Sequence, residues 1–249
     1  MLSARSILGA LFLIAGSSAV PASAALITFS GEDIMPTTSS PHPLSAAAAA
    51  SFDAAVTALG GGSLVNFESA PLGSFSNLTI APGVTMNGTD VNGANQTIRN
   101  TSAFPSAPTL DGYNTTPGGA NFVEVMGGTL TFSFATPIQA FGAYFSGIQT
   151  NFFTDSITFS DGTSETVLIP GAGTNGFTGA LDFVGFTDVG KSIASVTVNA
   201  GSHTTGWDDI GVDDVRFQTV PVPEPASLAI FGTALAGLGL IRRRRRRSV

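Results

Sequence analysis

The sequence predicts an all-β protein, an antiparallel β-sandwich of jelly-roll type with one short N-terminal helix, on three observations. From Leu64 onward, about eleven short runs rich in Val, Ile, Thr and Phe follow one another, separated by Gly, Asn, Asp and Pro. Nineteen phenylalanines are available to fill a core. No internal repeat is evident, which argues against a propeller or a solenoid. We therefore expect most phenylalanines to lie between two packed sheets.

The predicted strands are short, and several alternate apolar with polar residues. Between residues 192 and 198, Val196 and Val198 fall on one face, while Ser195 and Thr197 fall on the other. The pair Asp161-Gly162 predicts a hairpin turn. The predicted strands are 26–29, 64–68, 76–80, 84–86, 122–125, 129–134, 138–146, 156–159, 165–169, 181–186, 193–199 and 210–217.

An alanine-rich stretch, 46–59, predicts the single helix, because Phe52 and Val56 recur at helical spacing. Ser45 is placed to cap its start, and Gly60-Gly61-Gly62 is placed to end it. An irregular, proline-containing connector precedes the helix. We expect residues 25–62 to form an N-terminal extension and residues 63–220 to form the β-sandwich domain.

The first 24 residues have the pattern of a signal peptide. Arg5 supplies the positive charge of the n-region, and residues 7–15 form a short apolar h-region. Ala22-Ser23-Ala24 provides the small residues that signal peptidase recognises before its cleavage site. The apolar run is much shorter than the roughly 20 residues that span a membrane. We expect cleavage after Ala24 and export of the remainder.

Charge is distributed unevenly along the chain. Between residues 25 and 222 the only basic residues are Arg99, Lys191 and Arg216, against sixteen Asp and Glu, a net charge of −13. Such a domain cannot neutralise phosphates, which excludes nucleic acid as a partner. It is compatible with divalent cations, with neutral sugars, or with a simply solvated acidic surface. The chain has no cysteine, so disulfides and thiolate metal sites are excluded.

The C-terminal end combines three features in a fixed order. The motif at 222–225 contains Pro223, Glu224 and Pro225, and two prolines around one acid keep the backbone extended. The apolar stretch 226–241 would reach about 24 Å as a helix, and flanking arginines can snorkel, so it can anchor in a membrane. The positive-inside rule keeps the arginines cytoplasmic and the acidic domain outside. These arginines are Arg242, Arg243, Arg244, Arg245, Arg246 and Arg247.

This segment, 221–249, resembles the PEP-CTERM sorting signal of Gram-negative bacteria. The resemblance implies that Pro223, Glu224 and Pro225 are recognised by an exosortase, with the helix and the arginine cluster as retention signal. It further implies an inner-membrane anchored intermediate, then transfer to the cell surface or extracellular matrix. Members of this family are typically associated with exopolysaccharide, biofilm or floc formation. A simple tail anchor with a proline-rich boundary is the alternative.

Four carboxylates crowd the last predicted strand: Asp208, Asp209, Asp213 and Asp214. Alternation in an extended strand places Asp209 and Asp213 on one face, with Asp208 and Asp214 on the other. Such crowding is costly unless the groups are solvated, paired with Arg216, or bound to a hard cation. The sequence therefore suggests a Ca²⁺ site here, with plain solvation at a strand end as the alternative.

Two aromatic residues beside polar neighbours, Tyr113 and Trp207, are candidates for stacking on a sugar ring; partial burial with a hydrogen bond is the alternative. A serine hydrolase is not supported, because Ser202 and His203 fall on opposite faces of an extended strand. Carboxylate pairs for glycoside hydrolysis would have to come from Glu68, Glu124 and Glu165, whose separation the sequence does not fix.

These features favour an exported, non-enzymatic surface or matrix protein whose β-sandwich associates with extracellular polysaccharide. A carbohydrate-active hydrolase is the second hypothesis, and a purely structural matrix component is the third. Signal peptidase and exosortase are the processing partners that this interpretation requires.

Overall fold

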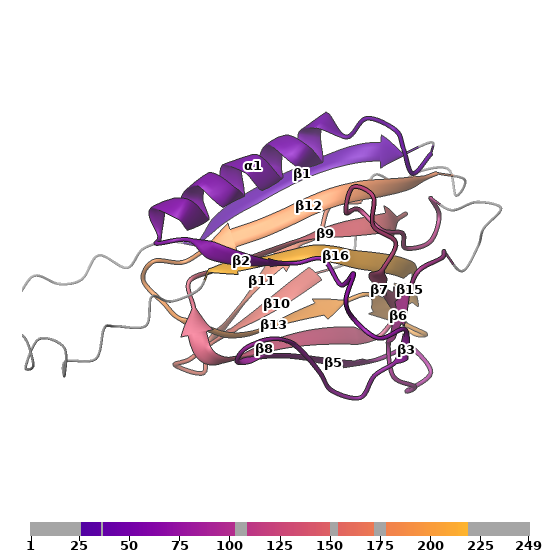
Figure 1. The fold of residues 1–249 in the computed structure, drawn as a ribbon. Coiled ribbons are helices and arrows are strands. Elements are labelled where there is room, and N and C mark those ends of the chain that lie inside the picture. Colours follow the sequence, from indigo (N-terminus) through magenta and orange to yellow (C-terminus); the bar gives the residue numbers. More distant parts are fainter. Residues whose placement is uncertain (1–25, 36, 103–108, 150–153, 172–177, 219–249) are drawn as a thin grey trace, which may run out of the picture.

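Two antiparallel β-sheets packed face to face form most of the computed structural model, which describes residues 26–35, 37–102, 109–149, 154–171 and 178–218 (Figure 1). In order across the larger sheet lie β1 (Ile27–Met35), β12 (Gly179–Thr187), β9 (Ala140–Ile148), β16 (Asp209–Gln218), β7 (Phe122–Met126), β6 (Thr97–Arg99) and β3 (Gly73–Ser74), and β2 (Gly62–Val65) pairs with β16. The smaller sheet contains β11 (Ser164–Leu168), β10 (Thr154–Phe159), β13 (Ile193–Asn199), β8 (Thr129–Ile138), β5 (Val84–Thr89) and β4 (Leu78–Ala81). A separate hairpin joins β14 (Gly201–Ser202) and β15 (Gly206–Trp207). The predicted antiparallel sandwich, mostly β with one helix, is confirmed.

The main hydrophobic core lies between the two sheets. Phe132 of β8 and Phe141 of β9 face each other across it, with ring centroids 5.2 Å apart. In β13, Val196 and Val198 are fully buried, while Ser195 and Thr197 are partly exposed, as the alternation predicts. The predicted turn after β10 is also present, since Gly162 has the positive φ of 82° that such a turn requires.

The helix α1 (Pro43–Ala58) covers part of the outer face of the larger sheet, above β1 and β12 (Figure 1). Its buried side recurs every three or four residues and centres on Phe52. The Phe52 ring lies 5.7 Å from Phe29 of β1 and 5.6 Å from Phe183 of β12, centroid to centroid. A second, smaller core therefore forms outside the sandwich.

The start of α1 differs from the prediction. Ser45 is not the N-cap, because the helix begins at Pro43 after His42, which makes no capping bond with its side chain. The free amides of Leu44 and Ser45 instead donate to the carboxylate of Asp33 in β1, at 3.2 and 2.7 Å. A carboxylate supplied by a neighbouring strand thus replaces the local serine. The helix ends as expected, before Gly60 with its φ of 106°.

Strand boundaries follow the prediction less well at the sheet edges. The first strand, β1, continues to Met35 instead of ending at residue 29, since it pairs with β12 along its whole length. The strand predicted at 64–68 ends at Val65, because Phe67 turns the chain with a φ of 56°. Four strands of two or three residues were not predicted, as segments this short carry no alternation: β3, β6, β14 and β15.

Candidate functional site

Strand β16 carries the crowded carboxylates and contains a β-bulge at Asp213 and Asp214. Its register with β9 shifts between Asp213 and Arg216, and Asp214 adopts a φ of 47°. Aspartate tolerates this left-handed conformation better than most residues. Ile210 and Val212 point into the core before the bulge, whereas Val215 and Phe217 do so after it. The predicted placement of Asp213 and Asp214 on opposite faces is therefore wrong, because the extra residue reverses the alternation.

Both carboxylates bind the same segment, residues 109–121, which we call the covering loop. The Oδ2 atom of Asp213 accepts hydrogen bonds from the amide of Thr115 at 2.7 Å, from the Thr115 hydroxyl at 3.1 Å and from the Asn114 side chain at 3.2 Å. The hydroxyl of Thr116 donates to Asp214 at 2.7 Å. Burial raises the pKa of Asp213 to about 7, against the opposing effect of the Thr115 amide. These carboxylates fasten a loop and are not solvated.

Two further contacts hold the covering loop on the outer face of the larger sheet. Ser146 of β9 accepts from the Tyr113 amide at 2.9 Å and donates to the Tyr113 carbonyl at 2.8 Å. Glu68 accepts from the amides of Ala120 and Asn121 at 2.9 and 3.1 Å. Gly112 lies so close to Gly211 of β16 that a Cβ on Gly112 would stand 2.3 Å from the Gly211 nitrogen. The loop is thus packed directly against the sheet.

A second acidic group lies at the beginning of β16. Asp208 accepts from the amide of Gln149 at 3.0 Å, and burial raises the pKa of Asp208 to about 6. Burial, with repulsion from Glu124, raises the pKa of Asp209 to about 8. Glu124 of β7 is paired with Arg99 of β6, yet burial still raises its pKa. Burial thus disfavours the charged form of each of these three carboxyl groups.

The four carboxylates do not converge on one point. Asp213 and Asp214 face the covering loop, while Asp208 binds Gln149. Within the described residues, which include all four, no group of three or more His, Cys, Asp or Glu is arranged to hold a metal ion. The alternative of solvation at a strand end is wrong for Asp213 and Asp214, whose exposed fractions are 0% and 6%.

The two aromatic candidates lie in different environments. Tyr113 belongs to the covering loop; its side chain is buried in the smaller core, and its hydroxyl has no hydrogen-bond partner among the described residues. A sugar cannot reach this ring without displacing the loop, and the alternative of a hydrogen-bonded tyrosine is not observed either. Trp207 of β15 is 42% exposed and packs beside Gly127. Of the pair, Trp207 alone presents a surface to a ligand.

The residues weighed for hydrolysis are engaged elsewhere. Glu68 binds the covering loop, Glu124 pairs with Arg99, and Glu165 of β11 binds Lys191 at 3.4 Å. The hydroxyl of Ser202 contacts those of Thr204 and Thr205 at 2.9 and 3.0 Å.

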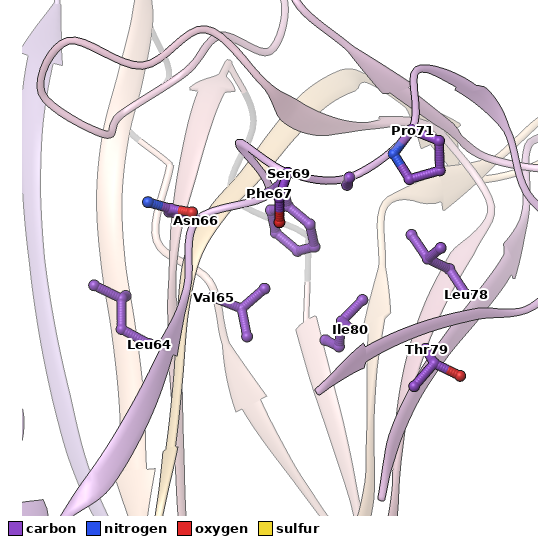
Figure 2. A pocket seen from close by; sticks show the side chains of 10 residues that line it. Leu64, Val65, Asn66, Phe67, Ser69, Pro71, Leu78, Thr79 and Ile80 are labelled. Carbon is purple, nitrogen blue, oxygen red and sulfur yellow. The ribbon is translucent and has the colours of Figure 1, made fainter. Parts of the chain in front are cut away.

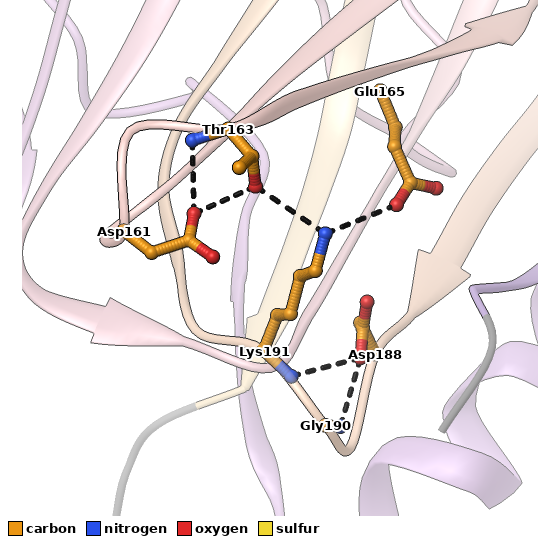
Figure 3. A network of polar contacts seen from close by, with 6 residues as sticks. All are labelled: Asp161, Thr163, Glu165, Asp188, Gly190 and Lys191. Atoms are coloured by element: carbon orange, nitrogen blue, oxygen red, sulfur yellow. Dashed lines mark hydrogen bonds and ion pairs between the residues drawn. The ribbon is translucent and has the colours of Figure 1, made fainter. Parts of the chain in front are cut away.

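Lys191 belongs to a network that joins two turns at one end of the sandwich (Figure 3). Its ammonium donates to the Thr163 hydroxyl and to Glu165, and it lies 4.5 Å from the centre of the Phe159 ring. Its amide donates to Asp188 at 2.9 Å. Since both nitrogens of Lys191 donate within this network, we assign it a structural role.

A pocket of about 240 Å³ opens where the segment after β2 meets β4 (Figure 2). Val65, Phe67 and Ile80 form its apolar floor, and Asn66 and Ser69 lie at its rim. None of its lining residues has an ionisable side chain, so the pocket offers no acid or base to activate the hydroxyls of Ser69 and Thr79.

Among the buried acids that the sequence analysis did not single out is Asp182 of β12. Its side chain lies on the core-facing side of the sheet, it is fully buried, and neither oxygen has a hydrogen-bond partner among the described residues. Burial, with repulsion from Glu32 and Asp33, raises the pKa of Asp182 to about 9. The available signal was a single acid within the apolar run Leu181-Asp182-Phe183-Val184.

The terminal predictions fall outside the described residues. These are the signal peptide at 1–24, the motif with Pro223, Glu224 and Pro225, the apolar stretch at 226–241 and the arginine cluster. Among the helices that the structure describes, none has the length and apolar character needed to cross a membrane.

Comparison with known proteins identifies one segment. The family model of the PEP-CTERM protein-sorting motif matches residues 221–246. A search of curated proteins returned no match. Similar solved structures include the K2 cleaved adhesin domain of Lys-gingipain, with 16% identity, a TM-score of 0.38, and coverage of 64% of this chain and 100% of that chain. Another is TmCBM61 in complex with β-1,4-galactotriose, with 13% identity, a TM-score of 0.31, and coverage of 62% and 94%. Similarity at this level says nothing about what this chain binds.

Proposed function

We propose that this chain, whose residues 221–246 match the PEP-CTERM protein-sorting motif, is an exported surface or matrix protein of a Gram-negative bacterium, processed by an exosortase near Pro223, Glu224 and Pro225. The motif match at 221–246 is the observation that carries this proposal. Residues 226–241 and the arginine cluster hold the intermediate in the inner membrane, and the acidic domain lies on the far side. Signal peptidase removes residues 1–24.

The processing step is tested by replacing Glu224 with alanine. We expect the variant to remain in the membrane fraction with its arginine tail, as a heavier band than the wild-type product. Glu165→Ala is the matched control, because it removes an exposed carboxylate in β11 and leaves the sorting motif intact. Equal mass and location for the Glu224→Ala variant and the wild type would reject exosortase processing.

The sandwich itself is proposed to associate with extracellular polysaccharide without chemical turnover. Its low content of basic residues favours neutral partners over phosphates, and Trp207 offers an exposed aromatic surface. A jelly-roll topology is part of this proposal, since consecutive strands alternate between the sheets: β8 then β9, β10 and β11 then β12, β13 then β16.

Co-sedimentation of the full chain with insoluble polysaccharides tests the association. Retention without release of sugar is expected. Release of reducing sugar would instead support the hypothesis of a carbohydrate-active hydrolase. If the chain is retained on no polymer, the remaining hypothesis is a purely structural matrix component.

A further inference from the structure

Hydroxyl side chains form aligned rows on the outer face of the six-stranded sheet. Cross-strand pairing places one residue from each of the six strands in the first row, and all six carry a hydroxyl: Ser164, Thr158, Ser195, Ser133, Thr85 and Thr79. The second row reads Thr166, Ser156, Thr197, Thr131 and Asn87. The third reads Leu168, Thr154, Asn199, Thr129 and Thr89. We call these sixteen residues the hydroxyl face.

The hydroxyl face is uncharged in a domain that is otherwise strongly acidic. Thirteen of its residues are Ser or Thr, two are Asn and one is Leu, whereas residues 25–222 carry sixteen carboxylates. The face therefore has no charge that would attract an ionic partner, and none that a partner would have to neutralise. A partner that matches it is neutral and rich in hydrogen-bonding groups.

No described segment covers the hydroxyl face. None of its sixteen residues is buried, and α1 packs on the other sheet (Figure 1). Thr131 and Thr197, at its centre, have their hydroxyls 2.9 Å apart. Within the described residues the remaining hydroxyls make no side-chain hydrogen bond, so each is available to a ligand after loss of water.

The geometry of a sheet makes these donors and acceptors periodic. Neighbouring strands lie about 4.8 Å apart, and residues on one face recur about every 6.7 Å along a strand. Stiff β-branched threonines lose little freedom when they bind. A regular array of this kind suits a partner that is itself extended and repetitive.

We propose that the hydroxyl face binds a neutral, hydroxyl-rich polysaccharide chain laid along the sheet. This inference rests on the polysaccharide association proposed above. It assigns the binding surface to the hydroxyl face instead of to the exposed ring of Trp207. Each hydroxyl contributes a weak hydrogen bond, so affinity arises from many bonds made together.

The test uses the full chain in a sugar-free detergent, with cellulose and cross-linked dextran as neutral probes and alginate gel as the anionic probe. We expect the double variant Thr131→Val and Thr197→Val to raise the Kd for the neutral polymer at least tenfold, which is about 1.4 kcal/mol. Valine keeps the shape and the β-propensity of threonine while it removes the hydroxyl. A second variant, Asn87→Lys, places a cation in the same row at an exposed position and is expected to weaken binding as well.

Two controls isolate the hydroxyls. Replacement of Thr131 and Thr197 by serine keeps both hydroxyls and is expected to retain binding. Replacement of Thr204 and Thr205 by valine removes two exposed hydroxyls outside the face and is also expected to retain it.

The outcomes separate this inference from the proposed function. Retention on alginate alone, or loss of binding in Trp207→Ala with the valine pair unaffected, overturns the hydroxyl face and leaves polysaccharide association standing. Retention on no polymer overturns both. A wild-type dimer that the valine pair converts to monomer, without polysaccharide binding, would show that the face binds a second copy of the chain.

Discussion

The outer faces of the two sheets differ in what lies over them. On the larger sheet, α1 packs on Phe183 and the covering loop binds Asp213, while the carboxylates of Asp33 and Asp213 fasten these two covers. On the smaller sheet the hydroxyl face is open and uncharged. The comparison teaches that the crowded acids, the most conspicuous feature of the sequence, serve the architecture. The hydroxyl face, by contrast, carries no charged side chain and none of its residues is buried.

The largest difference between the faces is expected for Phe52→Ala, on the buried side of α1. Phe52 is fully buried against Phe29 and Phe183, and loss of such a ring costs about 3–5 kcal/mol of unfolding free energy. Ser195→Ala on the hydroxyl face should change it by less than about 0.5 kcal/mol. Urea denaturation measures both, and equal losses would contradict the distinction between a covered and an open face.

A smaller loss is expected when the covering loop is released. Asp213→Ala leaves the amides of Thr115 and Thr116 without their acceptor, at a cost of about 1–3 kcal/mol. Limited proteolysis should then cut within residues 109–121 before any other described segment. Asp161→Ala, at the exposed β10–β11 turn, serves as control and should leave the loop resistant. Resistance of the loop in Asp213→Ala would show that Glu68 and Ser146 suffice to hold it.

The buried acid of the larger sheet should make stability depend on pH. Burial raises the pKa of Asp182 from its ordinary value of 3.8 to about 9, so the folded state retains a proton that the unfolded state releases between these values. The free energy of unfolding therefore falls as pH rises through this window, and this contribution is fully present below it. Asp182→Asn should make the fall in melting temperature between pH 5 and 8 shallower, while Asp161→Asn keeps the wild-type slope. An unchanged slope in Asp182→Asn would assign the pH dependence to other groups.

The smallest effect is expected from calcium. Asp213 already accepts several hydrogen bonds, and no described group of three carboxylates is arranged around a cation. Melting temperatures in millimolar calcium and in chelator should therefore coincide. A rise with calcium that Asp213→Asn abolishes would restore the calcium site suggested by the sequence.

Alternation and turn residues predict the fold class because they are local signals. Val196 and Val198 face the core as expected, and the turn at Gly162 is present. The bulge at Asp214 was not predictable, since one residue of extra length leaves no mark in composition. It reversed the phase of β16 and so decided which acids share a face.

The candidate site depended on contacts between distant segments, which the sequence does not reveal. Ser45 is a residue type that commonly caps helices, but the amides at the start of α1 donate to Asp33 instead. Asp33 lies beside the helix because β1 pairs with β12. Tyr113 and Trp207 look alike in the sequence, but the covering loop carries Tyr113 into a buried position against the sheet, whereas Trp207 is exposed. The hydroxyl face has the same origin, because each strand shows its own alternation while only the register aligns six strands into rows.

The position of β16 within its sheet has a mechanical consequence. The strand ends at Gln218, the last described residue before the sorting segment, and it pairs with β9 on one side and with β7 and β2 on the other. Tension applied by a tether at that end runs along the strand and loads its hydrogen bonds in shear, many at once, instead of peeling an edge strand away one bond at a time. For a domain tethered as proposed, this arrangement resists unfolding by a force applied at the C-terminal end.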